Sequence, residues 1–172
     1  MTWIEVVDSA VKIGLGALIT GIIAFVLSTT QHRNDRKKSK VAREFEMLKE
    51  VAEKVESFNH VALKYWALAT DWRRKLELDR SLVKPKSLLD AQKDLFNSFS
   101  ELTNAESLLL LFGYEDAQIA LRDYGESVVT FRKKVLSVDT NFDENDAASY
   151  RESMIYRRAK LFKLLNDIYK TI

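Results

Sequence analysis

The chain has 172 residues, of which 47% are hydrophobic and 30% charged, with a formal net charge of +2. This length suits one folded domain with an appendage and excludes two full domains. The absence of cysteine excludes disulfides, thiolate metal sites and cysteine nucleophiles. Because there are only five glycines and one proline, the composition favours long helices over a turn-rich β fold.

An uncharged apolar segment lies near the N-terminus. Residues 13–27 carry no charge, and the wider stretch Ser9–Thr30 contains Lys12 as its one charged residue. As a helix this stretch would be ~33 Å long, close to the ~30 Å hydrocarbon core of a bilayer. The long side chain of Lys12 can reach the headgroups, and Trp3 stands where an interfacial aromatic is expected. The sequence therefore predicts a transmembrane helix over residues 9–30.

The charges that flank this segment predict its orientation. Glu5 and Asp8 precede it, whereas residues 32–43 (HRNDRKKSKVAR) are strongly basic. Lysine and arginine mark the cytoplasmic side, so we expect residues 1–8 outside, residues 31–40 as a basic juxtamembrane collar and residues 41–172 as a cytoplasmic helical bundle. This arrangement is a single pass through the inner (plasma) membrane. Two alternatives are a cleaved signal peptide and a buried core helix. A signal peptide would carry its positive charge before the apolar run, whereas here the charge follows it. A buried core helix would normally show a polar face, whereas this segment is apolar all round.

A stripe of small residues runs along the predicted transmembrane helix. Its members are Ala10, Gly14, Ala17, Gly21, Ala24 and Ser28. Spacings of four and three place them on one helix face, where small side chains let two lipid-embedded helices approach closely. We expect this face to mediate homo-oligomerisation or pairing with a partner transmembrane protein. The alternative is that glycine and alanine are common in membrane helices anyway, and Gly16 and Thr20 do lie off the stripe.

The basic collar predicts contact with membrane lipids. Its headgroup-binding candidates are Arg33, Arg36, Lys37, Lys38 and Lys40. Each such cation near an anionic membrane surface contributes ~1 kcal/mol of binding. Nucleic-acid binding is the competing interpretation, but no aromatic side chains interleave the cluster and it would be pressed against the membrane.

A long amphipathic helix is expected from residue 41 to about residue 78. Its apolar-biased series steps by four and three, with an interruption at Arg73. Any break from the preceding helix is expected in the polar stretch 28–35. Further apolar residues beside the series, such as Val51, Phe58, Tyr65 and Trp72, widen the stripe enough to contact several neighbours. The series comprises Val41, Phe45, Leu48, Ala52, Val55, Asn59, Ala62, Trp66, Ala69 and Leu76.

Three more helices complete the predicted fold. The second runs from Pro85 to Phe112 and ends at Gly113, with Leu88, Leu95, Phe99, Leu102, Ala105, Leu109 and Phe112 inward. The third buries Ala117, Leu121, Tyr124, Val128, Phe131 and Val135. The fourth, from about Ala147 to Tyr169, buries Tyr150, Met154, Leu161, Leu165 and Ile168, and Asn141, Asp143 and Asp146 are its cap candidates. The expected fold class is all-α, one N-terminal transmembrane helix followed by an antiparallel four-helix bundle.

No pattern in the sequence indicates catalysis. His32 lies in the basic collar, and His60 alone cannot form a zinc site without cysteine or a second well-placed histidine. The carboxylate–histidine spacing of di-iron bundles does not occur. The chain has no phosphate-binding glycine loop or nucleophile elbow, and its acidic loop 137–146 lacks the central glycine of a calcium loop. We expect no enzyme, no cofactor, no metal and no small-molecule substrate. Asn59 either fixes the register of the bundle as a buried amide or lies at its edge.

One segment carries a family resemblance. Residues Ala105–Tyr124 (AESLLLLFGYEDAQIALRDY), together with the N-terminal apolar stretch, resemble uncharacterised bacterial or phage-associated single-pass membrane proteins with a small cytoplasmic helical domain. Those proteins have a similar Leu-x-Leu-Phe-Gly helix junction. The resemblance implies a prokaryotic or mobile-element origin and no activity.

Together these features predict a non-enzymatic, membrane-anchored adaptor or sensor. It would oligomerise through its transmembrane helix and present the bundle to partner proteins, with membrane lipids as a further partner and no nucleic acid. The alternative is a membrane-perturbing effector, pore-forming or depolarising, that is controlled by its cytoplasmic bundle. A water-filled pore is disfavoured because the predicted span has no polar face beyond its small residues.

Overall fold

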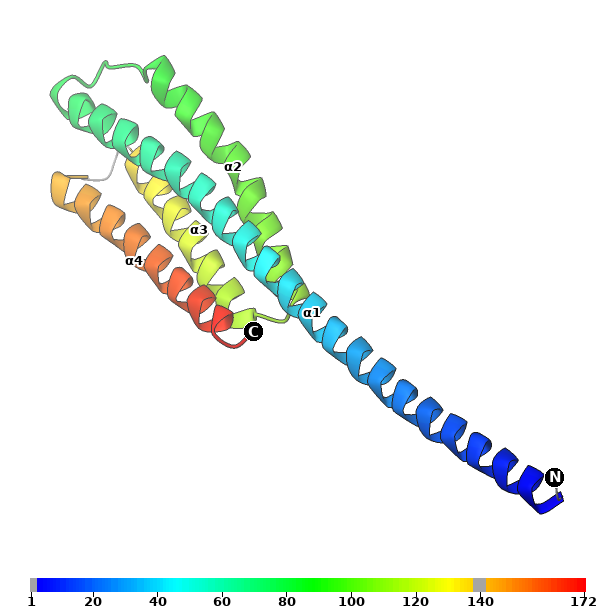
Figure 1. Ribbon diagram of the computed structural model, residues 1–172. Helices are drawn as coiled ribbons and strands as arrows, with labels where there is room; N and C mark the ends of the chain where they lie inside the picture. The colour runs from blue at the N-terminus through cyan, green and yellow to red at the C-terminus, as the bar shows by residue number, and fades with distance from the viewer. Residues whose placement is uncertain (1–2, 138–141) are drawn as a thin grey trace. The chain divides into compact units, whose positions relative to one another are not determined.

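The computed structural model describes the backbone of residues 3–137 and 142–172, and the side chains of residues 36–137 and 142–172. The described backbone forms four helices and no strand: α1 (Trp3–Leu78), α2 (Lys86–Leu111), α3 (Glu115–Leu136) and α4 (Glu144–Tyr169) (Figure 1). The all-α prediction is confirmed. The bounds of α1 include residues 28–35, where the sequence left room for a break.

The chain divides into two compact units, residues 1–43 and residues 44–172. Among the described side chains, no helix is both long and apolar enough to span a bilayer. The predicted transmembrane stretch and its small-residue stripe, Ala10 to Ser28, lie outside the described side chains, as does Arg33.

Residues 44–172 form a four-helix bundle. The later part of α1, α2, α3 and α4 lie side by side, and the chain reverses its direction at each connection, so neighbouring helices along the chain are antiparallel (Figure 1). Aromatic rings fill much of the interior between α1 and α3. The ring centroid of Phe58 lies 5.6 Å from that of Tyr124, and the centroid of Tyr65 lies 6.1 Å from that of Phe131.

The buried stripe of α1 differs from the prediction in half of its positions. Val41 and Phe45 are 42% and 45% exposed, while Ala52, Asn59 and Trp66 are half-buried. The prediction is confirmed at Leu48, Val55, Ala62, Ala69 and Leu76. The other buried residues of the stripe lie between these five, at Val51, Phe58, Tyr65 and Trp72. Because the apolar stripe is wider than one heptad seam, its centre is set by the helices that pack on it, and the aromatic rings of α3 lie on the side of Phe58 and Tyr65.

The inward positions of α2, α3 and α4 largely follow the sequence. All the predicted core residues of α3 are buried, and most of those of α2 and α4 are. Phe99, Phe112, Tyr150 and Ile168 are half-buried. A Cβ atom added at Gly125 would lie 3.1 Å from Leu102 Cδ1, so this glycine lets α2 and α3 pack closely.

The helix ends obey local hydrogen-bonding rules. Gly113 has φ +80°, and the amides of Gly113 and Tyr114 donate to Leu110 O at 3.0 Å and Leu109 O at 2.9 Å. This Schellman motif confirms Gly113 as the residue that ends α2. Pro85 is the residue before α2, not part of its first turn.

The start of α4 lies three residues before the predicted one, at Glu144. Asp143 Oδ1 accepts from the Asp146 amide at 2.8 Å, and the Asp146 carboxylate accepts from the Asp143 amide at 3.4 Å. The two predicted cap candidates thus form one capping box, which satisfies amides that the first turn of a helix leaves unpaired. The third candidate, Asn141, lies outside the described residues.

Candidate functional site

The described part of the basic collar is exposed. The side chains of Arg36, Lys37, Lys38 and Lys40 are all exposed. Their charged groups are therefore accessible to solvent, as headgroup binding requires. These residues belong to the unit of residues 1–43.

On the bundle, the outward side of α2 carries large apolar side chains in water. Phe96 is 74% exposed, Leu110 52% and Leu111 78%. With the exposed polar residues between them they lie at spacings of three and four along one side of the helix. We define the α2 outer face as Phe96, Asn97, Ser100, Thr103, Asn104, Ser107, Leu110 and Leu111.

The α2 outer face carries no charge. Between Asp94 and Glu115 the sequence contains only Glu101 and Glu106 as charged residues. Glu101 accepts a hydrogen bond from Lys54 Nζ on α1 at 2.9 Å, which raises the pKa of Lys54. Glu106 accepts from Arg122 Nε on α3 at 2.8 Å. Both carboxylates are thus directed toward neighbouring helices, and the outward side between them is neutral.

The hydroxyl groups on this face are bonded within α2. Ser100 Oγ donates to Asn97 O at 2.7 Å, Thr103 Oγ1 to Phe99 O at 3.1 Å and Ser107 Oγ to Thr103 O at 2.9 Å. A buried polar group without a partner destabilises a protein by ~1–3 kcal/mol. These three hydroxyls keep their partners when water leaves, whereas the exposed side-chain amides of Asn97 and Asn104 would need partners from a covering molecule.

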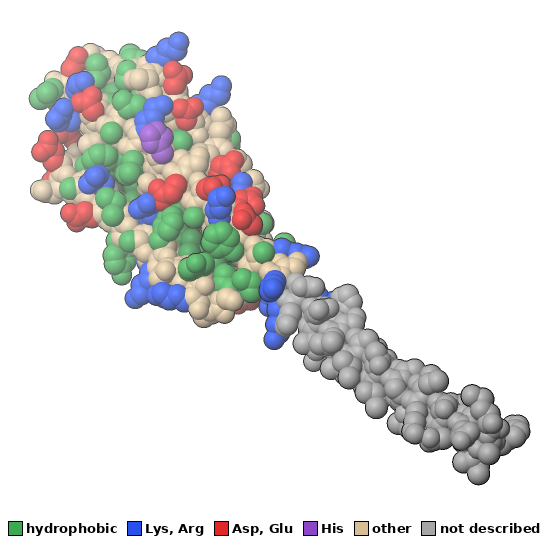
Figure 2. Space-filling view, in the orientation of Figure 1, with side chains coloured by type: hydrophobic (Ala, Val, Ile, Leu, Met, Phe, Trp, Pro, Cys, Tyr) green, Lys and Arg blue, Asp and Glu red, His purple; other side chains and the backbone are tan. Residues whose placement is uncertain are grey.

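Figure 2 shows basic, acidic and hydrophobic side chains on the surface of the bundle. Exposed ion pairs join its helices, including Lys64 with Asp94 at 3.3 Å and Arg157 with Asp123 at 3.7 Å. A mixed, charged surface keeps a protein soluble and monomeric. The α2 outer face lacks this protection, which is typical of a surface that contacts another molecule.

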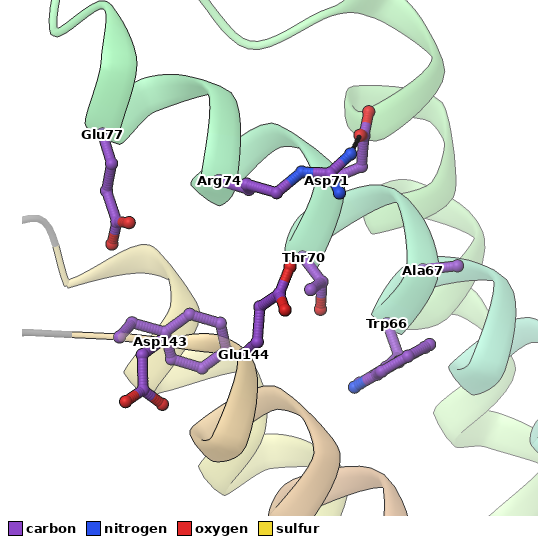
Figure 3. A pocket seen from close by; sticks show the side chains of 9 residues that line it. Trp66, Ala67, Thr70, Asp71, Arg74, Glu77, Asp143 and Glu144 are labelled. Atoms are coloured by element: carbon purple, nitrogen blue, oxygen red, sulfur yellow. Dashed lines mark hydrogen bonds and ion pairs between the residues drawn. The ribbon is translucent and has the colours of Figure 1, made fainter.

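A cleft of about 240 Å³ lies between α1 and the start of α4. Figure 3 shows Trp66, Thr70 and Glu77 of α1 on one side and Asp143 and Glu144 on the other. Its carboxylates outnumber its single guanidinium, that of Arg74. An aromatic wall beside carboxylates would suit a cationic group better than an anion.

The polar groups of this cleft already serve the fold. Asp71 accepts hydrogen bonds from Lys75 at 2.7 Å and Arg74 at 2.9 Å, and these cations lower its pKa. Trp66 Nε1 donates to Ala147 O at 3.0 Å, and Asp143 caps α4. The volume is also below the ~300 Å³ of ordinary ligand pockets. The cleft is therefore better described as the joint between α1 and α4 than as a ligand site.

A wider hollow of about 480 Å³ lies where α3 begins and α4 ends. Its charged lining comprises Glu115, Asp116 and Asp167. The amides at a helix N-terminus attract anions, but here the acidic first turn of α3 repels them. The charged lining of this hollow therefore does not favour an anion.

Two buried tyrosines show how α1 meets α3. Tyr124 Oη donates to Asn59 Oδ1 at 3.0 Å, so the amide that the sequence singled out is half-buried and anchors a core phenol. Burial raises the pKa of Tyr124 well above its usual range and that of Tyr65 to about 12. His60 is exposed, and no group of three carboxylate or histidine side chains in the described ranges could hold a metal ion.

No family model, characterised protein or solved structure matches this chain. The resemblance to bacterial or phage single-pass membrane proteins therefore stays a prediction. Sequence reasoning missed the α2 outer face because it searched for apolar periodicity on the inward side. The available signal was the low charge between Asp94 and Glu115 in a chain that is 30% charged.

Proposed function

We propose that the chain is a membrane-anchored, non-enzymatic adaptor or sensor of bacterial or phage origin. Residues 9–30 would cross the inner membrane, with residues 1–8 outside and the bundle in the cytoplasm. The small-residue stripe would pair transmembrane helices, and the collar would bind anionic headgroups. The hydrophobic length of the segment and the basic residues that follow it support this proposal.

The observation that carries the adaptor role is the α2 outer face. Phe96, Leu110 and Leu111 are exposed on a neutral surface whose hydroxyl groups donate hydrogen bonds to backbone carbonyls of α2. Such a surface is suited to contact with protein, since covering it removes apolar area from water without stranding a charge. A bundle that presents this face at a membrane has the parts that an adaptor needs.

Membrane fractionation tests the anchor. The full chain should sediment with membranes and stay there through an alkaline carbonate wash, which strips peripheral proteins. A control variant with Leu18→Lys and Ile22→Lys places two charges within the apolar stretch, at ~2.5–3.5 kcal/mol each. This variant should move to the supernatant or to aggregates. Recovery of the unchanged chain in the soluble fraction, without aggregation, would contradict the proposal.

A second measurement separates the adaptor from the membrane-perturbing effector. Expression of the full chain is followed with a potential-sensitive dye, and the doubly charged variant is the matched control. An adaptor leaves the membrane potential unchanged in both cultures. Prompt depolarisation by the unchanged chain alone would favour the effector.

A further inference from the structure

We propose that α4 is a lid of the bundle, which opens and closes as one helix while α2, α3 and residues 44–78 of α1 remain folded. The lid acts within residues 44–172, which form one compact unit, so it does not depend on the membrane anchor. Opening gives the bundle a second conformation, in which side chains of α1 and α3 that α4 covers are exposed to water.

The helix α4 buries few of its side chains. Four of its 26 residues are buried, whereas α2 buries seven of 26 and α3 nine of 22. The buried residues of α4 form a single line at spacings of seven, seven and four: Ala147, Met154, Leu161 and Leu165. The free energy that holds a helix in place rises with the apolar area that it buries. We therefore expect α4 to detach at a lower cost in free energy than α2 or α3.

The ion pairs between α4 and the other helices lie partly in water. Arg158 Nε donates to Glu56 at 2.8 Å, and Arg157 lies 3.7 Å from Asp123. The side chains of both pairs are between 33% and 45% exposed. Exposed ion pairs add little to stability, because water solvates the separated charges. Both pairs can therefore break and form again as α4 moves, without a buried charge being left unpaired.

The ends of α4 are capped from within its own segment. Asp143 and Asp146 form the capping box at its start. At its end the amide of Lys170 donates to Asn166 O at 3.1 Å. Detachment of α4 from α1 and α3 breaks none of these bonds, so the helix keeps its caps when it moves.

The other three helices are joined to each other without α4. The ring centroid of Phe58 on α1 lies 5.1 Å from that of Phe99 on α2 and 5.6 Å from that of Tyr124 on α3. Tyr124 Oη also donates to Asn59 Oδ1 on α1 at 3.0 Å. The three helices therefore share a core that persists when α4 leaves.

Two aromatic side chains mark the closed position of the lid. On α1, Trp66 Nε1 donates to Ala147 O at 3.0 Å. On α3, the ring centroid of Phe131 lies 5.8 Å from that of Tyr150. Both contacts exist only while α4 is closed, so opening exposes the sides of Trp66 and Phe131 that face α4.

Native-state hydrogen exchange of the full chain in detergent micelles tests the lid. Amides in the middle of α4 should be at least ~100-fold less protected than those in the middle of α3, because α4 opens without global unfolding. Their exchange should also rise less steeply with urea, since the opening of one helix exposes less surface than the unfolding of the bundle.

Two tryptophan variants separate a lid from unfolding of the whole bundle. Trp66→Phe removes the hydrogen bond to Ala147 and should raise the exchange of α4 by about five-fold. Trp72→Phe is the matched control. Trp72 is 4% exposed, and its ring centroid lies 5.4 Å from Nζ of Lys84, just before α2, so it stays packed when α4 opens. This control should raise the exchange of α3, because it leaves a cavity in the persisting core, and should leave that of α4 unchanged.

Three outcomes would overturn the lid. Equal protection and equal urea slopes in α3 and α4 would mean that the bundle opens as one unit. A rise in α4 exchange as large in Trp72→Phe as in Trp66→Phe would mean the same. A complete lack of protection in α4 of the unchanged chain would mean that this helix does not close. Circular dichroism of both variants checks that they fold, and failure of the membrane anchor is detected separately, by fractionation.

Discussion

The outward side of the later part of α2 differs in charge from the outward side of α4. Both helices are 26 residues long, and both belong to the same bundle. The exposed residues of α4 include Arg151, Glu152, Lys160 and Lys163. The exposed residues of α2 are charged only in its first part, at Lys86, Asp90, Lys93 and Asp94, and the α2 outer face that follows has no charge. Since α4 accepts charge on its outward side without loss of its inward packing, the fold itself does not require a neutral α2. The difference is therefore a property of the α2 surface and not a requirement of the packing inside the bundle.

The sharpest test of this comparison uses adjacent residues of α2. Leu95 is 1% exposed and Phe96 74% exposed. Leu95→Ala should lower the free energy of unfolding by ~2–5 kcal/mol, because it leaves a cavity in the core. Phe96→Ala should change it by less than ~0.5 kcal/mol, as surface substitutions do. Urea unfolding of the full chain in detergent micelles measures both, and comparable losses would show that the bundle itself packs on Phe96.

A smaller loss of stability is expected from a substitution at Gly113, where α2 ends. Gly113→Ala should lower the free energy of unfolding by ~1–2 kcal/mol, because φ +80° is disfavoured for a residue with a Cβ atom. No heavy atom lies within 4 Å of the added Cβ, so the cost is confined to the backbone. Gly113→Asn is the control and should cost less, since asparagine tolerates this conformation. Equal losses in the two variants would contradict the backbone explanation.

The next effect separates the two buried phenols. Tyr124→Phe removes the hydrogen bond to Asn59 and should destabilise the fold by ~1 kcal/mol. Tyr65 Oη is buried and has no hydrogen-bond partner among the described residues. Tyr65→Phe should therefore be neutral or slightly stabilising. Thermal unfolding of both variants measures which substitution destabilises the fold more. A larger loss of stability for Tyr65→Phe than for Tyr124→Phe would contradict this prediction.

The smallest effect at neutral pH concerns Tyr65, whose ionisation makes the stability of the fold depend on pH only in alkali. The pKa of Tyr65 is raised by burial from 10.0 to about 12. A raised pKa in the folded state means that the neutral phenol is favoured, so this stabilisation is complete below pH 10 and is lost as the pH rises toward 12. Tyr65→Phe should therefore reduce the alkaline loss of stability between these values. Unfolding measured at several pH values, with phenolate absorbance as a second signal, checks this.

The sequence predicted the helices well where one apolar stripe faces one core. All the expected residues of α3 are buried, and Gly113 and Asp143 mark helix ends by local hydrogen bonding. It predicted α1 less well because apolar residues flank the heptad seam on both sides. Only packing against α3 decides that Phe58 is fully buried while Asn59 is half-buried.

The candidate site was not predictable in the same way. Periodicity of apolar residues finds cores, but the α2 outer face is defined by missing charge and by the side-chain directions of Glu101 and Glu106. Those directions depend on where Lys54 and Arg122 lie, which is a property of the assembled bundle. The composition of residues 95–114 hints at a neutral helix, but only the three-dimensional arrangement shows that its outward side is neutral.

The hydrogen bond from Trp66 to Ala147 joins α1 to the first turn of α4 across 81 residues of chain. The guanidinium of Arg151 also lies 5.6 Å from the centre of that indole. Detachment of α4 would remove both neighbours and expose the ring to water. The wavelength of Trp66 fluorescence therefore reports whether α4 is packed against α1. It can be measured in a chain whose other tryptophans are replaced by phenylalanine.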